Sequence, residues 1–320
     1  MYKFSVIVPC YNIENRVDKL FELFREKTDV AIEAIFVDDC STDNSFELMR
    51  QKQLEYRNVF VYQTDKNGGP GMARNVGLMH ARGKYIVFCD SDDEFEIPYM
   101  SQVCNYIDEL NEPDMLVFPH MVIRGEKEVK EDCFKQYKHL CEVKAEDIAC
   151  GFGGPVAKVF KKEIIDRNKI FFPNRMTGED CCFVVNYAVH VKKAYKIDYS
   201  YYRYVMNKQS VTHSYYKKEL EQPTTYELLQ RVFKEHFPDK EIEMFVNRHL
   251  LTRAKQMSDA SVPLYIMRKW YKSENLKYPN WINEIAFDEQ SIYRKCIYLA
   301  MYYNRPMLIK MIMQIRKLLY

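Results

Sequence analysis

Three aspartates follow a hydrophobic run within a few residues, and they are the groups that most directly suggest chemistry. The run KYIVFC (84–89) predicts a buried strand, and Asp90, Asp92 and Asp93 come directly after it. Residues i and i+2 of an extended chain point to the same side, so Asp90 and Asp92 can face one ligand. Carboxylates this close repel one another unless a cation neutralises them. Oxygen ligands favour Mg²⁺ or Mn²⁺, and we expect such an ion carrying a nucleotide diphosphate.

A second acidic pair, Glu179–Asp180, begins a helical pattern in the second half of the chain. A carboxylate there can act as general base for a hydroxyl group, because an alcohol is a poor nucleophile until its proton is removed. Both acidic motifs also have a structural explanation. Asp-rich turns cap helices, and acids favour the first turn of a helix through its dipole. Neither motif decides by itself between the two explanations.

Strand and helix patterns alternate up to residue 90, which predicts a mostly parallel sheet covered on both faces. The expected strands are 3–9, 31–39, 58–64 and 84–90, and the expected helices are 14–27, 43–54 and 71–83. The polar loops PCYN, DDCSTD and DSDD follow three of these strands. Ligands of open α/β sheets bind at the carboxyl ends of strands, so we expect the three loops to form a nucleotide-binding crevice.

The rest of the chain continues with both kinds of element and then becomes helical. We expect a helix at 97–110, a strand at 114–123, a solvated hairpin or loop at 124–136, two short helices around the glycine-rich turn 151–155, and a strand at 194–205. The expected organisation is an α/β domain over 1–215, with a nucleotide half at about 1–123 and an acceptor half at about 124–215. A helical region follows over 216–320.

The composition is that of a globular protein with a sizeable core, since 47% of the 320 residues are hydrophobic and 29% are charged. The net charge of +2 does not favour nucleic acid as a partner. The ten cysteines lie mostly in apolar runs without C-x-x-C spacing, which favours reduced core thiols over a zinc site. Neither a leader pattern nor an apolar run that could span a bilayer is found, so we expect a cytoplasmic protein.

Four segments, taken in order, resemble the motif set of the inverting family 2 glycosyltransferases with the GT-A fold. They are FSVIVPCYN (4–12), FVDDCSTD (36–43), KNGGPGMARNVGL (66–78) and FCDSDDE (88–94). Four motifs in this order are far more specific than any one of them. The resemblance implies a Rossmann-like, mostly parallel sheet. It also implies metal-dependent transfer of a sugar from a nucleotide diphosphate, with UDP as the expected carrier, to a saccharide or lipid-linked acceptor in surface polysaccharide or glycoconjugate synthesis.

The same resemblance assigns the donor side of the reaction. The expected donor-binding residues are Pro9, Tyr11, Asp38, Asp39, Gly71, Arg74, Asp90 and Ser91. Pro9 and Tyr11 would line the base pocket, and Asp39 would accept a hydrogen bond from the base. The expected ligands of Mn²⁺ or Mg²⁺ are Asp92, with Asp90, Asp93 and His213 as further candidates.

On the acceptor side, the resemblance makes Asp180 the general base, next to Glu179. It implies that Lys158 lies near the acceptor pocket, where an exposed helix lysine is the alternative. Three residues of the segment 201–213 are implied to close over the diphosphate, namely Arg203, Ser210 and His213. Gly178 departs from the family pattern, because an aromatic or aliphatic residue often precedes the acidic pair there.

Two other functional classes stay open from the sequence. A nucleotidyltransferase uses similar paired acids and releases pyrophosphate, and a non-catalytic protein would bind the nucleotide sugar without reaction. Phosphatases of the haloacid dehalogenase type fit less well, because Glu94 stands where they have Thr or Val. A dinucleotide-binding loop is also disfavoured, because the glycines of 66–78 break the G-x-G-x-x-G spacing.

The end of the chain, residues 304–320, combines Arg305, Lys310, Arg316 and Lys317 with Met, Leu and Ile and contains no acid. Such a basic amphipathic helix can lie on an anionic membrane at its inner face. Packing on its own domain, or on a second subunit, is the alternative that the periodicity leaves open.

Overall fold

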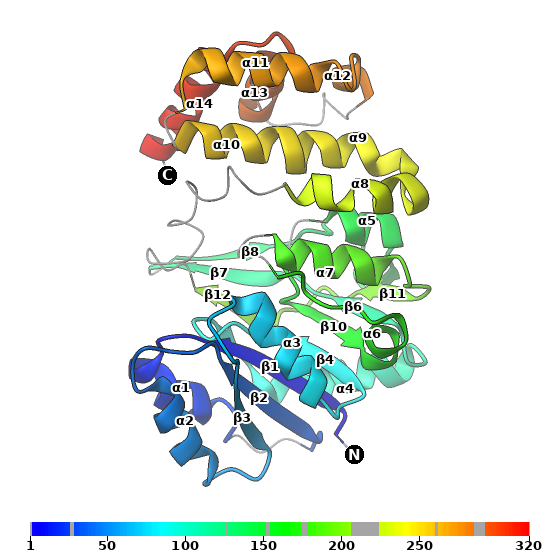
Figure 1. Cartoon of the computed structure of the whole chain (residues 1–320). Helices are drawn as coiled ribbons and strands as arrows, with labels where there is room; N and C mark the ends of the chain where they lie inside the picture. Colours follow the sequence, from blue (N-terminus) through cyan, green and yellow to red (C-terminus); the bar gives the residue numbers. More distant parts are fainter. Residues whose placement is uncertain are drawn as a thin grey trace. The chain divides into compact units, whose positions relative to one another are not determined.

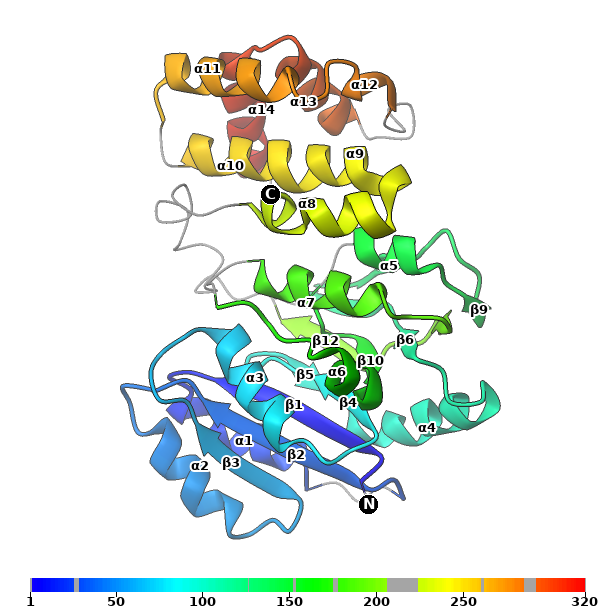
Figure 2. The same cartoon turned by 45° about the vertical axis from the view of Figure 1, so that its right-hand side comes forward.

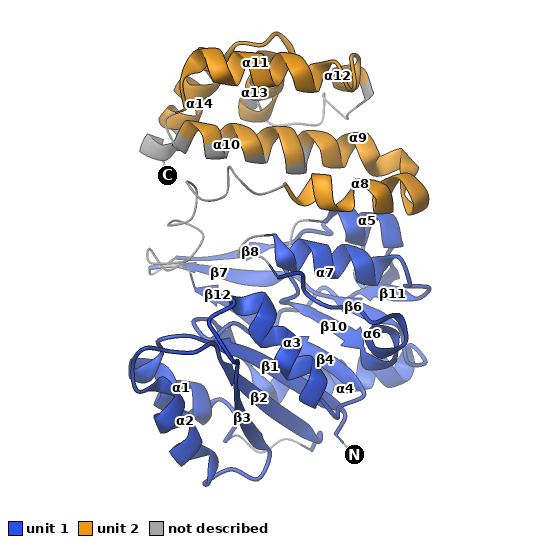
Figure 3. Cartoon of the chain, viewed as in Figure 1, with its two compact units in different colours: residues 1–208 blue, residues 209–320 orange. Residues whose placement is uncertain are grey.

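The computed structural model of the chain forms two compact units, Met1–Lys208 and Gln209–Tyr320 (Figure 3). It describes residues 2–25, 29–125, 127–151, 154–174, 178–205, 224–259, 262–284 and 292–319. The sequence placed the boundary between residues 215 and 216, and both positions lie in 206–223, outside the described residues. Unit 1 is α/β and the described part of unit 2 is helical, as expected.

The main sheet of unit 1 has eight strands in the order β3-β2-β1-β4-β10-β6-β11-β9 (Figure 1). Its strands are β1 Phe4–Cys10, β2 Ile32–Asp38, β3 Val59–Gln63, β4 Tyr85–Phe88, β6 Met115–Val117, β9 Cys141–Glu142, β10 Lys158–Lys161 and β11 Ala194–Lys196. Strands β3, β2, β1 and β4 run parallel to one another, and β10 inserts antiparallel between β4 and β6. The carboxyl ends of β1, β2 and β4 therefore meet at one edge, as the sequence predicts.

Helices cover both faces of this sheet. Those of unit 1 are α1 Val17–Glu22, α2 Ser45–Gln53, α3 Pro70–His80, α4 Met100–Glu109, α5 Ala145–Cys150, α6 Lys162–Asn168 and α7 Glu179–Ala188, with 3-10 turns at Glu14–Arg16 and Ile97–Tyr99. Successive residues of β1 face opposite sides, so Phe4 and Val6 join the cluster with α1 and α4 while Ile7 faces α3. In both views α3 covers β1 and β2 (Figures 1 and 2).

A second sheet of four strands, in the order β5-β12-β7-β8, was not expected as a separate layer. Its strands are β5 Glu94–Phe95, β7 His120–Arg124, β8 Lys127–Glu131 and β12 Tyr202–Val205. The predicted strand 114–123 is wrong as one element: Phe118 and Pro119 interrupt it, so β6 and β7 join different sheets. The predicted strand 194–205 likewise divides into β11 and β12. At 124–136 the hairpin alternative holds, since β7 and β8 pair antiparallel around Gly125 (φ +61°).

Unit 2 is built from helices, and hydrogen bonds of a buried histidine link some of them. They are α8 Thr225–His236, α9 Glu241–Met244, a π-helix Phe245–Leu250, α10 Leu251–Asp259, α11 Leu264–Asn275, α12 Trp281–Glu284, α13 Ile292–Tyr302 and α14 Pro306–Leu319, with a 3-10 turn at Pro238–Lys240. The ring nitrogens of His249 lie 2.8 Å from the Thr224 hydroxyl and 2.9 Å from the Glu274 carboxylate. In the parts of the chain that the structure describes, no helix has the length and apolarity to cross a bilayer.

Gly77 tests how closely α3 packs on β1. A Cβ added at Gly77 would lie 2.3 Å from Cγ2 of the fully buried Ile7. We expect Gly77→Ala to lower the free energy of unfolding by about 1–3 kcal/mol through overpacking, measured by urea denaturation. Met79→Ala is the matched control, because the Met79 side chain on the same helix is 68% exposed. This substitution should change the free energy of unfolding by less than about 0.5 kcal/mol. Equal stability of Gly77→Ala and the native chain would contradict this packing.

Candidate functional site

Hydrogen bonds between the loops after β1 and β2 build the first wall of the site. Asn12 donates its backbone N–H to the Ser41 hydroxyl at 2.9 Å, and its side-chain oxygen accepts the Thr42 N–H at 2.8 Å. Pro9 is buried within β1, whereas Tyr11, which follows the strand, is 45% exposed. The Tyr11 ring is thus accessible at the strand edge, where an aromatic face can stack on a base.

Asp38, at the end of β2, supports its own loop. This buried carboxylate accepts the Ser41 N–H at 3.0 Å and the Gln63 side-chain amide at 3.0 Å. These contacts engage the Asp38 carboxylate in holding its own loop, and its expected contact with the donor stays a prediction.

Asp39 holds the glycine-rich loop that leads into α3. Its side chain accepts the Thr64 hydroxyl at 3.0 Å, the Gly68 N–H at 3.0 Å and the Gly69 N–H at 2.6 Å. Gly69 has φ +84°, a conformation that glycine adopts at little cost, and it is the residue before α3. Asp39 therefore fixes the start of α3, and its hydrogen bond to a base stays a prediction.

Arg74 lies at the centre of the site, on α3, and is 4% exposed. Its Nη2 donates to Asp90 Oδ1 at 2.6 Å, its Nη1 lies 3.7 Å from Glu179 Oε1, and its guanidinium stands over the Phe172 ring, 5.4 Å from the centroid. Burial opposes the charge, but the Asp90 and Glu179 carboxylates overcome it and raise the Arg74 pKa. Arg74 thus connects the DSDD motif (90–93), which follows β4, with the acidic pair Glu179–Asp180 of α7.

Two donor atoms of Arg74 lack a hydrogen-bond acceptor among the described residues. Nε and Nη1 are both buried and unsatisfied. Buried polar atoms are nearly always hydrogen-bonded, so an exception at such a site points to an absent partner. A ligand rich in acceptor oxygens, such as a diphosphate or a sugar, would satisfy them.

Gly71 allows the beginnings of α3 and α7 to approach each other. A Cβ at Gly71 would lie 2.7 Å from Glu179 Cγ and 3.2 Å from Phe172 Cβ. Glu179 is buried, and burial together with Asp180 raises its pKa while Arg74 opposes the rise. Glu179 is therefore a buried counterion of Arg74. It can take this position because Gly71 has no side chain.

The four residues of DSDD have different environments. Asp90 forms an ion pair with Arg74. The Ser91 backbone carbonyl accepts a hydrogen bond from Arg16 Nε at 3.2 Å. Asp92 is partly buried, and burial followed by the Asp90 charge raises its pKa, while its own backbone N–H and the Arg16 charge oppose the rise. Asp92 therefore carries a carboxylate that a cation would stabilise.

Asp93 is committed to the second sheet. The Tyr202 hydroxyl donates to one of its oxygens and the Val205 N–H donates to the other at 2.8 Å. Burial and Asp90 raise the Asp93 pKa to about 8. Tyr202 also accepts the Asp90 backbone N–H at 3.2 Å. With both oxygens engaged, Asp93 holds β12 against the motif, which does not favour its expected role as a metal ligand.

The described residues contain no group of three or more His, Cys, Asp or Glu side chains arranged around a metal position. A metal that also binds a diphosphate needs few protein ligands, because phosphate oxygens and water fill the other positions. Asp92, with its raised pKa and single weak cationic neighbour, fits such a site. Metal binding itself stays a prediction.

Asp180 lies at the first turn of α7 and is less buried than Glu179. Its Oδ1 accepts the Cys181 N–H at 2.6 Å, and its Oδ2 would lie 3.0 Å from a Cβ added at Gly154. Two glycines thus allow the backbone to lie close to this pair, Gly71 beside Glu179 and Gly154 beside Asp180. Among the described residues no donor bonds to the other oxygen of Asp180, which is the one that faces Gly154.

Lys158 lies on β10 and not on a helix, so the exposed-helix alternative is wrong. Its ammonium is buried and donates to the Gly154 carbonyl at 2.8 Å. Burial lowers the Lys158 pKa, and the Asp180 charge partly opposes this. Lys158 therefore supports the Gly154 segment and contributes positive potential at Asp180.

Arg203 points away from the aspartates. It lies between Tyr202 and Tyr204 on β12, and its guanidinium contacts the carboxylates of Glu94, Glu96 and Glu128 at 2.9–3.5 Å. Neighbouring residues of a strand face opposite sides, and Tyr202 faces Asp93, so Arg203 faces away from that carboxylate. This placement gives no support to its expected contact with a diphosphate. Ser210 and His213 lie outside the described residues.

Two residues of the site, and a histidine near Lys158, were not singled out from the sequence. Tyr202 bridges Asp90 and Asp93, and Phe172 packs under Arg74. His120, on β7, is half-buried, with its pKa lowered first by burial and also by the nearby Lys158 charge. The alternating aromatic pattern around residue 202 was a usable signal for Tyr202, whereas nothing local marks Phe172 or His120.

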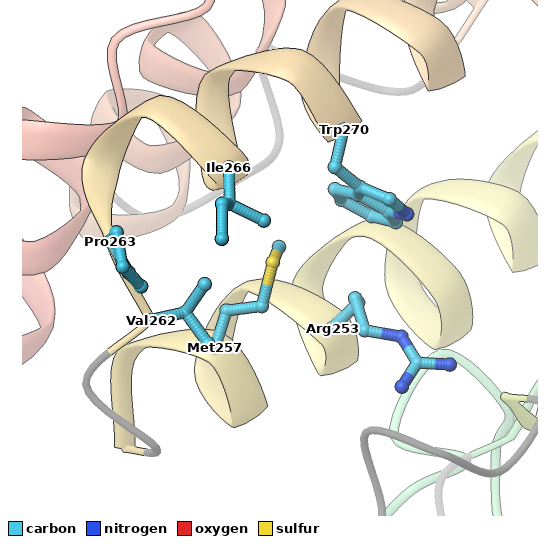
Figure 4. A pocket seen from close by; sticks show the side chains of 6 residues that line it. All are labelled: Arg253, Met257, Val262, Pro263, Ile266 and Trp270. Atoms are coloured by element: carbon cyan, nitrogen blue, oxygen red, sulfur yellow. The ribbon is translucent and has the colours of Figure 1, made fainter.

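A separate pocket of about 480 Å³ lies in unit 2 (Figure 4). Its lining is apolar apart from one cation and consists of Arg253, Met257, Val262, Pro263, Ile266 and Trp270. It contains no carboxylate and no nucleophile, so we assign it no part in the chemistry of unit 1.

Known glycosyltransferases are similar to this chain in sequence. The family model described as Glycosyl transferase family 2 matches residues 5–167. The poly(ribitol-phosphate) beta-N-acetylglucosaminyltransferase TarS of Staphylococcus aureus is 26% identical over 318 residues, which is 96% of this chain and 53% of TarS. The poly(ribitol-phosphate) beta-glucosyltransferase of Bacillus spizizenii is 33% identical over 207 residues, 62% of this chain and 32% of that protein. The chain thus spans about half the length of TarS, and less of the second relative.

Solved structures show the same fold. The crystal structure of S. aureus TarS 1–349 superposes with a TM-score of 0.68 at 23% identity, covering 99% of this chain and 92% of that one. The complex of TarS 1–349 with UDP-GlcNAc gives a TM-score of 0.65 at 21% identity, covering 98% and 91%. The likeness establishes the GT-A fold that the sequence motifs predict.

Removal of the Arg74 charge tests whether it holds the site together. We expect Arg74→Met to lower the free energy of unfolding by about 3 kcal/mol or more, because the Asp90 and Glu179 carboxylates lose their shared counterion. Chemical denaturation measures this change. Arg167→Met is the control, since Arg167 is 70% exposed and pairs with Glu163 on a helix surface, worth under about 0.5 kcal/mol. Similar small effects of the two substitutions would contradict the central role of Arg74.

Proposed function

Because the chain belongs to glycosyl transferase family 2, we propose that it is a glycosyltransferase that transfers a sugar from a UDP-sugar to a hydroxyl of a polyol-phosphate polymer of the cell surface. The relatives support this acceptor class. TarS and the Bacillus spizizenii enzyme are both named poly(ribitol-phosphate) transferases, although one transfers N-acetylglucosamine and the other glucose. The acceptor class is thus shared between them while the sugar differs, so we leave the sugar open.

The observation that carries the proposal is the position of Arg74 between Asp90 and Glu179. One guanidinium contacts the motif expected to bind the donor and the pair expected to serve the acceptor. A transferase needs both sites within bonding distance of one reacting carbon. A protein that only bound nucleotide sugar would not need the second acidic pair so close to the first.

In the proposed reaction Asp180 takes the proton of the acceptor hydroxyl. The acceptor oxygen that loses this proton attacks the anomeric carbon from the face opposite the diphosphate. The bond from that carbon to the phosphate oxygen breaks. The configuration at that carbon is inverted. Arg74 supports the reaction by donating to oxygens of the donor through Nε and Nη1. Glu179 keeps Arg74 oriented and buried.

A divalent cation held by Asp92 would neutralise charge on the departing diphosphate. The raised pKa of Asp92 supports this assignment, because an uncompensated buried carboxylate is stabilised by a cation. Asp90, already bound to Arg74, would orient the donor rather than hold the cation.

A panel of nucleotide sugars, assayed with Mn²⁺ and poly(ribitol phosphate), tests the function. We expect release of a nucleoside diphosphate together with a glycosylated polymer. Release of pyrophosphate would indicate a nucleotidyltransferase instead. Binding of UDP without any turnover would support a non-catalytic protein and contradict the proposal.

Two substitutions separate the proposed roles within that assay. Asp180→Asn should lower transfer by about a hundredfold or more and leave UDP affinity nearly unchanged, since the base is lost but not the donor site. Asp92→Asn should also abolish transfer, and in addition weaken UDP binding in Mn²⁺ but not in EDTA. Asp166→Asn, a 56% exposed aspartate on α6, is the control that should behave as the native chain. Full transfer by Asp180→Asn would show that another group is the base.

A further inference from the structure

Helix α14 exposes an apolar stripe. Met307 is 64% exposed, Leu308 45%, Met311 48% and Ile315 52%. At 100° per residue these four positions lie on one side of the helix, while the fully buried Ile309 lies on the other. A contiguous row of large apolar side chains on a surface usually marks a site of interaction. We call these four residues the C-terminal stripe.

One of the polar residues beside the stripe is turned inward. Lys310, only partly exposed, donates its ammonium to the Val262 carbonyl at 2.7 Å, on the flank of the stripe. This contact attaches α14 beside the start of α11, where Tyr265 is 74% and Ile266 43% exposed. Ile266 and Val262 also line the apolar pocket of unit 2 (Figure 4). The apolar surface therefore extends beyond α14 itself.

The charge of this region has one sign. Residues 292–320 contain six basic residues and no acidic residue, namely Arg294, Lys295, Arg305, Lys310, Arg316 and Lys317. Exposed apolar side chains on a helix of a basic segment are the combination that binds an interfacial helix to anionic lipid. Such a helix lies in the headgroup region and does not cross the bilayer.

We propose that the C-terminal stripe is a docking surface for an anionic membrane. The inference is independent of the proposed function, because it rests on unit 2 alone. A second copy of the chain is the other occupant to consider. It would bring the same excess of positive charge to the contact, so like charges would oppose pairing. An anionic lipid surface complements both properties of the stripe.

Flotation of the full chain with vesicles tests the proposal. We expect it to bind vesicles of phosphatidylcholine and phosphatidylglycerol in equal parts, and not vesicles of phosphatidylcholine alone. Added salt should weaken the binding. The variant with Met307→Gln, Met311→Gln and Ile315→Gln should bind about tenfold or more weakly at unchanged charge.

The control is Leu54→Gln with Met79→Gln, at two apolar side chains of unit 1 that are 86% and 68% exposed. This variant should bind like the native chain. Circular dichroism and the midpoint of thermal unfolding check that both variants stay folded. Equal binding by the stripe variant, or equal binding to neutral vesicles, would overturn the proposal. So would a dimer, seen in sedimentation velocity, that only the stripe variant loses.

Discussion

The ion pairs of one buried guanidinium organise the site. Arg74 is almost entirely removed from water, and a buried charge is tolerated only when opposite charges and hydrogen bonds compensate it. Asp90 and Glu179 supply the compensation from elements far apart in the sequence. The positive charge of Arg74 in turn offsets the repulsion between the two acidic motifs. Without Arg74, the motif after β4 and the acidic pair of α7 would each hold a carboxylate that has lost this counterion.

Several local features exist to bring these three residues together. Asp39 fixes the loop before α3, and the positive φ of Gly69 lets the helix begin there. Gly71 removes the side chain that would push Glu179 away. On the other side Tyr202 connects Asp90 with Asp93 and so holds the motif to the second sheet. Close backbone approach at these positions allows the ion pairs of Arg74 to form.

Much of the nucleotide half could be predicted from sequence, because its information is local. Parallel strands deliver their carboxyl ends to one edge, so the loops after β1, β2 and β4 had to meet. The second half was harder. The short strand β10 precedes a helix with similar composition and is recognised only by its partners β4 and β6. The split of 114–123 into two sheets, and the burial of Lys158, likewise follow from pairing with distant segments.

Individual roles within a motif were also beyond the sequence. The three aspartates of DSDD look equivalent as letters, yet Asp90 binds Arg74, Asp93 binds Tyr202, and Asp92 is left with little compensation. Arg203 shows the converse, since its motif suggested a phosphate contact while three glutamates surround it. Side-chain direction and partner identity decided these cases.

The most direct test of the account is a double-mutant cycle on transfer efficiency. Asp90→Asn, Glu179→Gln and their combination are measured as kcat/KM, first in the native chain and then with Arg74→Met. We predict a coupling of about 1 kcal/mol or more between the two carboxylates while Arg74 is present, and additivity within about 0.5 kcal/mol once it is removed. Additive effects in the presence of Arg74 would show that the two acidic sites act independently, which contradicts the account.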